Sequence, residues 1–291
     1  MFKSAEGEAR FLQAYDAVVR EWPVACQELD LPTRLGTTHV IASGRAEAPA
    51  LVLLPSMAGT ATLWRPNVAA LSGHYRTYAV DVIGQVGKSV PARRIRSRQD
   101  FADWLADLLD SLQVRRASIV GSSYGAFLAL NQASLTPDRV DRVVLISPAG
   151  TFVVGLPWFL LRVMFRRLIL RQKARDITEL LGPGARLDPR DAAWGALMAV
   201  VLDQSARPNL VAPTVFSTRE LATIRAPTHL LVGEKEVLYD PHRALERAMA
   251  RMPGLTGAVV PGAHHLGALA CPDDVNERIL KFLRGDREER G

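Results

Sequence analysis

A serine between two glycines is the strongest chemical signal in the sequence. Gly121-Ser122-Ser123-Tyr124-Gly125 follows a short run of apolar, β-branched residues and precedes a segment rich in alanine and leucine. A G-x-S-x-G pattern in this context is typical of a tight strand-to-helix turn that exposes a nucleophilic hydroxyl, and the turn is so tight that its flanking positions must be nearly bare. The pattern therefore predicts covalent catalysis by Ser123, with the backbone N–H of Tyr124 directed at the oxyanion that forms.

A serine hydroxyl is a poor nucleophile without a base, and two adjacent histidines follow the last apolar run of the chain. In Gly262-Ala263-His264-His265, His264 stands where a glycine usually precedes the catalytic histidine of such a loop. We therefore predict that His265 is the base. The alternative interpretation is a pair of surface histidines.

Two carboxylates compete for the role of the acid that orients the histidine. The acid is expected in the loop after the apolar run 229–232, where Glu236 follows Gly233 at the usual spacing, with Glu in place of Asp. Asp240 is the rival, but it directly precedes Pro241 and has the features of a helix N-cap. We favour Glu236 and keep Asp240 as the alternative.

An oxyanion needs a second N–H donor, which is expected in the loop after Leu54. This loop reads Pro55-Ser56-Met57-Ala58-Gly59-Thr60, and Met57 is the predicted donor.

Short apolar runs alternate with segments of helical periodicity, which predicts an α/β fold with a parallel sheet covered on both faces. The predicted helices include one capped by Asp100 and one that begins at Pro241. The alternation stops between 151 and 218, which predicts an inserted helical cap between the core segments 1–150 and 219–291. The predicted strands contain 51–54, 77–80, 118–120, 143–146, 229–232 and 258–260.

The predicted cap contains the apolar and basic stretch 156–167. The plain interpretation is a helix with one face on the core and the other in water. The sharper hypothesis is that four side chains line an apolar acyl pocket: Trp158, Phe159, Met164 and Phe165.

Composition narrows the class of protein. The chain has 291 residues, 48% hydrophobic and 23% charged, with a net charge of +6 and two distant cysteines, Cys26 and Cys271. These values predict a globular protein without a disulfide framework, and the sequence offers no signal peptide or membrane span, so we expect a cytoplasmic location. No nucleic-acid recognition motif accompanies the positive charge. Gly84 to Ser89 ends like a phosphate loop, but Val82 occupies the position of its first glycine, and no metal or dinucleotide motif is present, so no cofactor is expected.

The chain resembles the α/β-hydrolase superfamily, and more closely the bacterial carboxylesterases of the carboxylesterase NP kind. Besides the motifs above, the resemblance rests on 35–44, 75–81, 233–242 and 275–278. It implies an α/β-hydrolase fold with a mostly parallel eight-stranded sheet, and cofactor-free ester hydrolysis through Ser123, His265 and a carboxylate. The chain departs from the pattern at Pro55-Ser56, where many relatives carry His-Gly, at His264 and across the cap, which leaves the substrate open.

Other functions fit the same residues, because a fold does not fix a reaction. A thioesterase, a carbon–carbon bond hydrolase or a biosynthetic cyclase would share the triad, and basic residues near the cap would suit an acyl carrier protein as partner. A ligand-binding protein with an idle triad is a further alternative, favoured only by Pro55-Ser56. The leading hypothesis is hydrolysis of a small-molecule ester through an acyl-enzyme.

Overall fold

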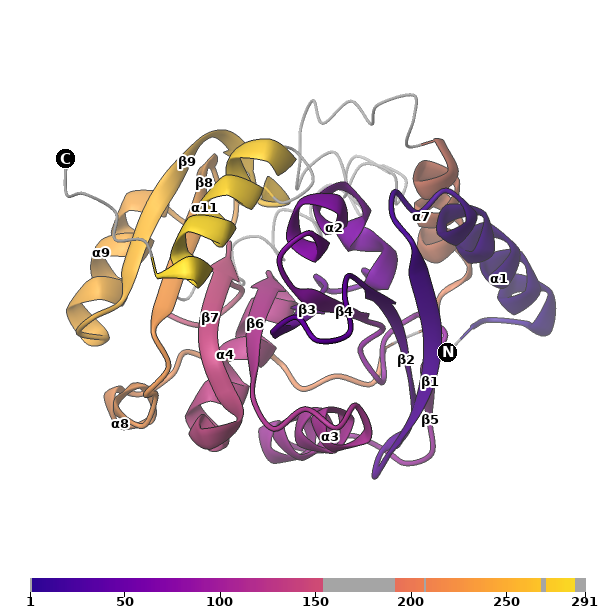
Figure 1. Cartoon of the computed structure of the whole chain (residues 1–291), viewed down its shortest axis with the longest axis horizontal. Helices are drawn as coiled ribbons and strands as arrows, with labels where there is room; N and C mark the ends of the chain where they lie inside the picture. Colours follow the sequence, from indigo (N-terminus) through magenta and orange to yellow (C-terminus); the bar gives the residue numbers. More distant parts are fainter. Residues whose placement is uncertain (1, 154–191, 207, 268–270, 286–291) are drawn as a thin grey trace, which may run out of the picture.

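The computed structural model describes residues 2–153, 192–206, 208–267 and 271–285. Within these residues one sheet forms the centre of the molecule (Figure 1). Its strands are β1 (Cys26–Thr33), β2 (Gly36–Ser43), β3 (Ala50–Leu54), β4 (Arg76–Val80), β5 (Val90–Pro91), β6 (Ala117–Ser122), β7 (Val140–Ile146), β8 (Thr228–Lys235) and β9 (Thr256–His264).

The order of the strands is β1-β2-β4-β3-β6-β7-β8-β9, with β5 paired to β2. All pairs from β4 to β9 are parallel, whereas β2 runs antiparallel to β1, β4 and β5. The prediction of a mostly parallel sheet is confirmed. The described sheet exceeds the eight predicted strands by β5, which is only two residues long and lies beside β2.

Each of the six apolar runs identified in the sequence lies in a parallel strand of the sheet. Strands β3 and β6 are buried along almost their whole length, as expected for strands covered on both faces. Strand β1 is different, because its residues alternate between half-buried and exposed at the edge of the sheet. Such a strand contains no continuous apolar run, so this sequence pattern does not predict it.

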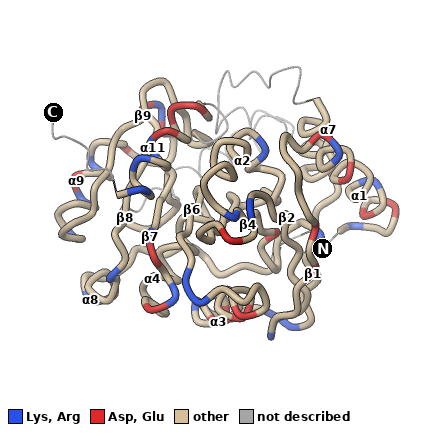
Figure 2. Tube along the Cα trace, viewed as in Figure 1, with Lys and Arg blue, Asp and Glu red and all other residues tan. Residues whose placement is uncertain are grey.

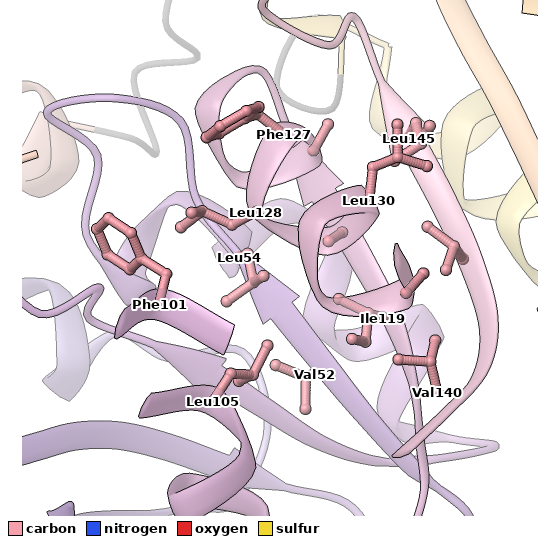
Figure 3. Close-up of a cluster of buried hydrophobic side chains, with 14 of the residues drawn as sticks. Val52, Leu54, Phe101, Leu105, Ile119, Phe127, Leu128, Leu130, Val140 and Leu145 are labelled. Atoms are coloured by element: carbon pink, nitrogen blue, oxygen red, sulfur yellow. The ribbon is translucent and has the colours of Figure 1, made fainter. Parts of the chain in front are cut away.

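Helices cover both faces of the sheet, and each face has its own apolar core. Residues of α1, α2, α7 and α11 join the core of one face, and those of α3, α4, α8 and α9 join the other, part of which Figure 3 shows between α3, α4 and the central strands. The helices are α1 (Ala5–Arg20), α2 (Arg65–Ser72), α3 (Arg98–Ser111), α4 (Tyr124–Leu135), α7 (Ala192–Gln204), α8 (Thr218–Ala222), α9 (Pro241–Arg251) and α11 (Pro272–Arg284), with short 3-10 turns η1 (Ala61–Trp64) and η2 (Pro137–Arg139).

The start of α3 corrects one prediction. Asp100 is not the N-cap of this helix, because Ser97 takes that place and accepts a hydrogen bond from the Asp100 N–H. Asp100 is the third helical residue, and its carboxylate accepts from the N–H of Ser97 at 3.0 Å and of Arg96 at 2.8 Å. The two residues form a reciprocal capping box, a pattern that is present in the sequence as S-x-x-D.

The predicted cap lies partly outside the described residues, so its boundaries at 151 and 218 stay a prediction. Within the described part, α7 packs against α1. Residues 208–217, the return segment, lead back to the sheet and are tied at three points to the loop after β4, to α4 and to the segment after β7. The N–H of Asn209 donates to the carbonyl of Gly84 at 2.9 Å. The Tyr124 hydroxyl donates to the carbonyl of Val211 at 2.9 Å. The N–H of Phe216 donates to the carbonyl of Thr151 at 3.0 Å.

Charges of both signs are interspersed along the described chain (Figure 2). Several arginines are paired, for example Arg34 with Asp107 at 2.7 Å and Arg139 with Asp110 at 2.6 Å. Cys26 and Cys271 are free thiols. Among the residues that the structure describes, no helix is long and apolar enough to cross a membrane, and no group of three or more His, Cys, Asp or Glu is arranged to hold a metal ion.

Candidate active site

Ser123 lies in a sharp turn between the end of β6 and the first residue of α4. Its φ is 52° and its ψ is −107°, a conformation that glycine adopts readily and that strains any residue with a Cβ. The turn brings backbone atoms very close together. A Cβ on Gly121 would collide with the backbone of Gly125, and a Cβ on Gly125 would collide with the carbonyl of Leu54. The two glycines of the motif are therefore required by the packing of the turn.

His265 lies in the turn directly after β9, and its ring is buried beside Ser123. Its Nε2 is 2.8 Å from the Ser123 Oγ, although the two residues are separated by 142 positions in the sequence. His264 is the last residue of β9 and pairs in register with Lys235. The structure therefore brings His265, the predicted base, to the hydroxyl.

Glu236 follows β8 and occupies the other side of the His265 ring. Both of its carboxylate oxygens are 2.9 Å from the Nδ1 of His265, and its side chain is fully buried. Its Oε1 also accepts hydrogen bonds from the N–H groups of Val237 at 2.8 Å and Leu238 at 2.9 Å. The longer side chain of Glu thus folds back onto its own loop and still reaches the imidazole.

The rival carboxylate is used elsewhere. Asp240 caps α9, where its Oδ1 accepts a hydrogen bond from the N–H of Arg243 at 2.8 Å. Both interpretations of Asp240 were open from the sequence, and its geometry agrees with the N-cap.

Burial by itself raises the pKa of the Glu236 carboxyl, but its contacts outweigh burial. The neighbouring His265 and the hydrogen bonds from His265, Leu238 and Ser147 hold the pKa of Glu236 below its ordinary value. Ser147 follows β7, is fully buried and has a φ of 43°. Ser147 was not among the predicted site residues, and its only signal in the sequence is its place directly after a parallel strand, where functional side chains gather.

The predicted oxyanion loop follows β3, beside the turn that carries Ser123. Ser56 is buried, the N–H of Gly59 closes a turn on the Ser56 carbonyl at 2.9 Å, and Ala58 has a φ of 60°. Within the described residues, neither the N–H of Met57 nor that of Tyr124 takes part in a backbone hydrogen bond. The Met57 side chain is 45% exposed.

The four predicted pocket residues, Trp158, Phe159, Met164 and Phe165, lie outside the described residues, so the acyl-pocket hypothesis stays a prediction. A cavity of about 680 Å³ is present elsewhere, next to Glu28, His39 and Lys88. Its charged groups bind one another: His39 lies 2.7 Å from Asp30, and Lys88 lies 2.6 Å from Glu28. None of Ser123, His265 and Glu236 lines this cavity.

A sheet of this order, a strained serine after β6 and a buried histidine after β9 define a class of protein, and comparison with known families agrees. The model of the alpha/beta hydrolase family matches residues 51–278. The chain belongs to this family.

Its close relatives are bacterial. Carboxylesterase YbfK of Bacillus subtilis is 37% identical over 98% of this chain and 97% of its own length. The uncharacterized carboxylesterase nap of the same organism is 37% identical over 95% of this chain and 93% of its own. The crystal structure of naproxen esterase (carboxylesterase NP) from Bacillus subtilis superposes with a TM-score of 0.87 at 35% identity, covering 97% of this chain and 99% of that one. The predicted resemblance to this group is confirmed.

Proposed function

We propose that this chain hydrolyses carboxylic esters of small molecules, with Ser123 as the nucleophile of an acyl-enzyme mechanism. The observation that carries the proposal is the continuous hydrogen-bonded series from the Ser123 Oγ through His265 to Glu236, with distances of 2.8 and 2.9 Å. The relatives named carboxylesterases support an ester as the substrate.

The cycle begins when the Ser123 Oγ attacks the ester carbonyl carbon and His265 Nε2 takes the hydroxyl proton. The carbonyl oxygen becomes an oxyanion that accepts hydrogen bonds from the N–H groups of Met57 and Tyr124. The C–O bond to the alcohol then breaks, and His265 returns the proton to the leaving oxygen. In the second half, His265 takes a proton from water, the hydroxide attacks the acyl carbon, and the acid leaves as Ser123 regains its proton.

Glu236 has a separate task in this cycle. Its carboxylate accepts from Nδ1–H, which leaves Nε2 free to take the proton from Ser123, and it stabilises the imidazolium that then forms. The lowered pKa of Glu236 favours its ionised carboxylate, which is the form that accepts a hydrogen bond from Nδ1–H of His265.

The test is hydrolysis of p-nitrophenyl esters from C2 to C12. We expect Ser123→Ala to lose activity by a factor on the order of 10⁴ or more, and Glu236→Gln by about 10³–10⁴. Asp240→Asn is the matched control, because it alters the rival carboxylate that caps α9, and its kcat should stay close to wild type. Undiminished hydrolysis by Ser123→Ala would overturn the proposed mechanism.

The same series addresses the acyl group. A preference for longer chains would support the apolar acyl pocket, whereas indifference to chain length would argue against it. Acyl thioesters, free and on an acyl carrier protein, form the second arm of the assay. A higher kcat/KM for the thioester would identify a thioesterase on the same triad.

A further inference from the structure

The loop that carries Met57 is held by side chains from another loop. The Gln85 Oε1 accepts a hydrogen bond from the N–H of Ala58 at 2.8 Å, directly after Met57. Further along, the Asp81 Oδ1 accepts from the N–H of Ala61 at 2.6 Å. Both acceptors belong to the segment that follows β4. The segment 57–61 is therefore held at two backbone positions by partners that lie 27 and 20 residues away in sequence.

Gln85 is an unusual residue to bury for stability alone. Its side chain is fully buried, and within the described chain its Nε2 has no hydrogen-bond partner. A buried amide half-satisfied in this way costs free energy that an apolar side chain of the same size would not cost. Among the described residues, the one hydrogen bond that this amide makes is the one to the Ala58 N–H.

That hydrogen bond acts at the point where the loop is least constrained by its own backbone. Ala58 has a φ of 60°, a conformation that favours glycine. Among the backbone hydrogen bonds of the described residues, the one that closes this turn runs from the Gly59 N–H to the Ser56 carbonyl. The Ala58 N–H belongs to the peptide that joins Met57 to Ala58, and its hydrogen bond to Gln85 limits rotation of this peptide. The Met57 N–H lies on the adjoining peptide, across the Met57 Cα, so a looser Met57–Ala58 peptide would let the torsions of Met57 change and with them the direction of its N–H.

We propose that Gln85 is the positioning residue of the oxyanion site: by accepting from the Ala58 N–H, its amide oxygen holds the Met57–Ala58 peptide and thereby restricts the adjoining Met57 N–H to directions that face the oxyanion. The inference rests on the proposed function. It assigns to Gln85 a part of the support for a loop that has Pro55-Ser56 where many α/β-hydrolases have His-Gly.

The test compares kcat and KM of Gln85→Met with wild type on a p-nitrophenyl ester. Methionine has nearly the same shape but no acceptor of comparable strength. A displaced donor should lower kcat by about 10–10², less than the loss of a donor outright, while KM stays within about twofold. A boronic acid, which forms a tetrahedral anionic adduct with a serine, should lose affinity by a similar factor.

Two variants separate positioning from structure. Gln132→Met makes the same change at a buried glutamine of α4 that has no partner for its side chain within the described residues, and it should keep the wild-type kcat. Gln85→Glu keeps an acceptor at the same reach, whether ionised or protonated. If Gln85→Met lowers kcat tenfold or more, kcat of Gln85→Glu should lie between that of Gln85→Met and that of wild type.

The outcomes are decisive. Equal kcat for Gln85→Met and wild type, or equal losses in Gln85→Met and Gln132→Met, would overturn the inference. If Gln85→Met does not fold, Gln85→Asn moves the acceptor away from Ala58 by one methylene, and an unchanged kcat in that variant would overturn it equally. Wild-type hydrolysis that survives Ser123→Ala would instead refute the proposed function, and with it the oxyanion site that Gln85 supports.

Discussion

The strained backbone of Ser123 predicts that this residue, the proposed nucleophile, lowers the stability of the fold. A non-glycine residue in a sparsely populated region of φ and ψ costs roughly 1–3 kcal/mol. Ser123→Gly releases this strain, but glycine adds entropy to the unfolded chain at a cost of roughly 0.5–1 kcal/mol. We therefore expect Ser123→Gly to be more stable than Ser123→Ala by about 1 kcal/mol, although both variants lack the nucleophile.

The comparison with alanine isolates the backbone. Both variants lose the hydrogen bond between the Ser123 Oγ and His265, so this loss cancels. For a chain of 291 residues the expected difference corresponds to a shift in Tm of about 2 °C, which parallel thermal melts resolve. The melts should be run with the triad otherwise intact and without inhibitor.

The neighbouring serine provides the control. Ser122 is also buried, is the last residue of β6 and is not among the residues with positive φ. There the order should reverse, with Ser122→Gly less stable than Ser122→Ala. A Ser123→Gly protein that melts at or below Ser123→Ala would refute the claim that the turn stores strain at the nucleophile.

Three further predictions follow from the site. Gly125→Ala should abolish hydrolysis and destabilise the fold by about 1–3 kcal/mol, because its Cβ would meet the backbone at Leu54; a fully active variant would contradict this packing. Ser147→Ala should lower kcat several-fold without changing KM and raise the pKa of Glu236, as measured by NMR titration; an unmoved pKa would show that the hydroxyl does not support the carboxylate. The stability that ionised Glu236 contributes should be fully present above the ordinary glutamate pKa of about 4.3 and should be lost as pH falls through its lowered pKa. The difference in free energy of unfolding between wild type and Glu236→Gln, measured by urea titration, should therefore shrink below pH about 4.3. A difference that grows as pH falls would contradict this prediction.

Local patterns were sufficient for the parts of the site that local geometry dictates. The tight turn between β6 and α4 needs glycines at fixed places, so the five consecutive residues 121–125 are enough to single out Ser123 as a candidate nucleophile. Buried parallel strands need continuous apolar runs, so β3, β4 and β6 to β9 are visible in the sequence. The order of these strands then brings the turn after β9 beside the end of β6 only through pairing across the sheet, which composition does not reveal.

Support that acts between distant loops left no such pattern. Gln85 lies 27 residues from the N–H that it accepts, and Ser147 lies 89 residues before Glu236. A single polar residue in a loop has many possible partners, and only the folded chain selects one. At α3 the signal was present but was assigned to Asp100, because an acid directly before an apolar run also fits an N-cap.

The edge position of β9 has a consequence for how the protein is made. In the part of the chain that the structure describes, strand β9 pairs with β8 alone, so the strands before it can assemble without opening again to admit it. Synthesis delivers Ser123 more than a hundred residues before His265, and N-terminal parts of a chain begin to fold first. A nascent chain that ends before β9 therefore contains Ser123 without His265. Under the proposed mechanism we expect hydrolysis to begin only when the last strand docks, so the recovery of activity during refolding would report that event.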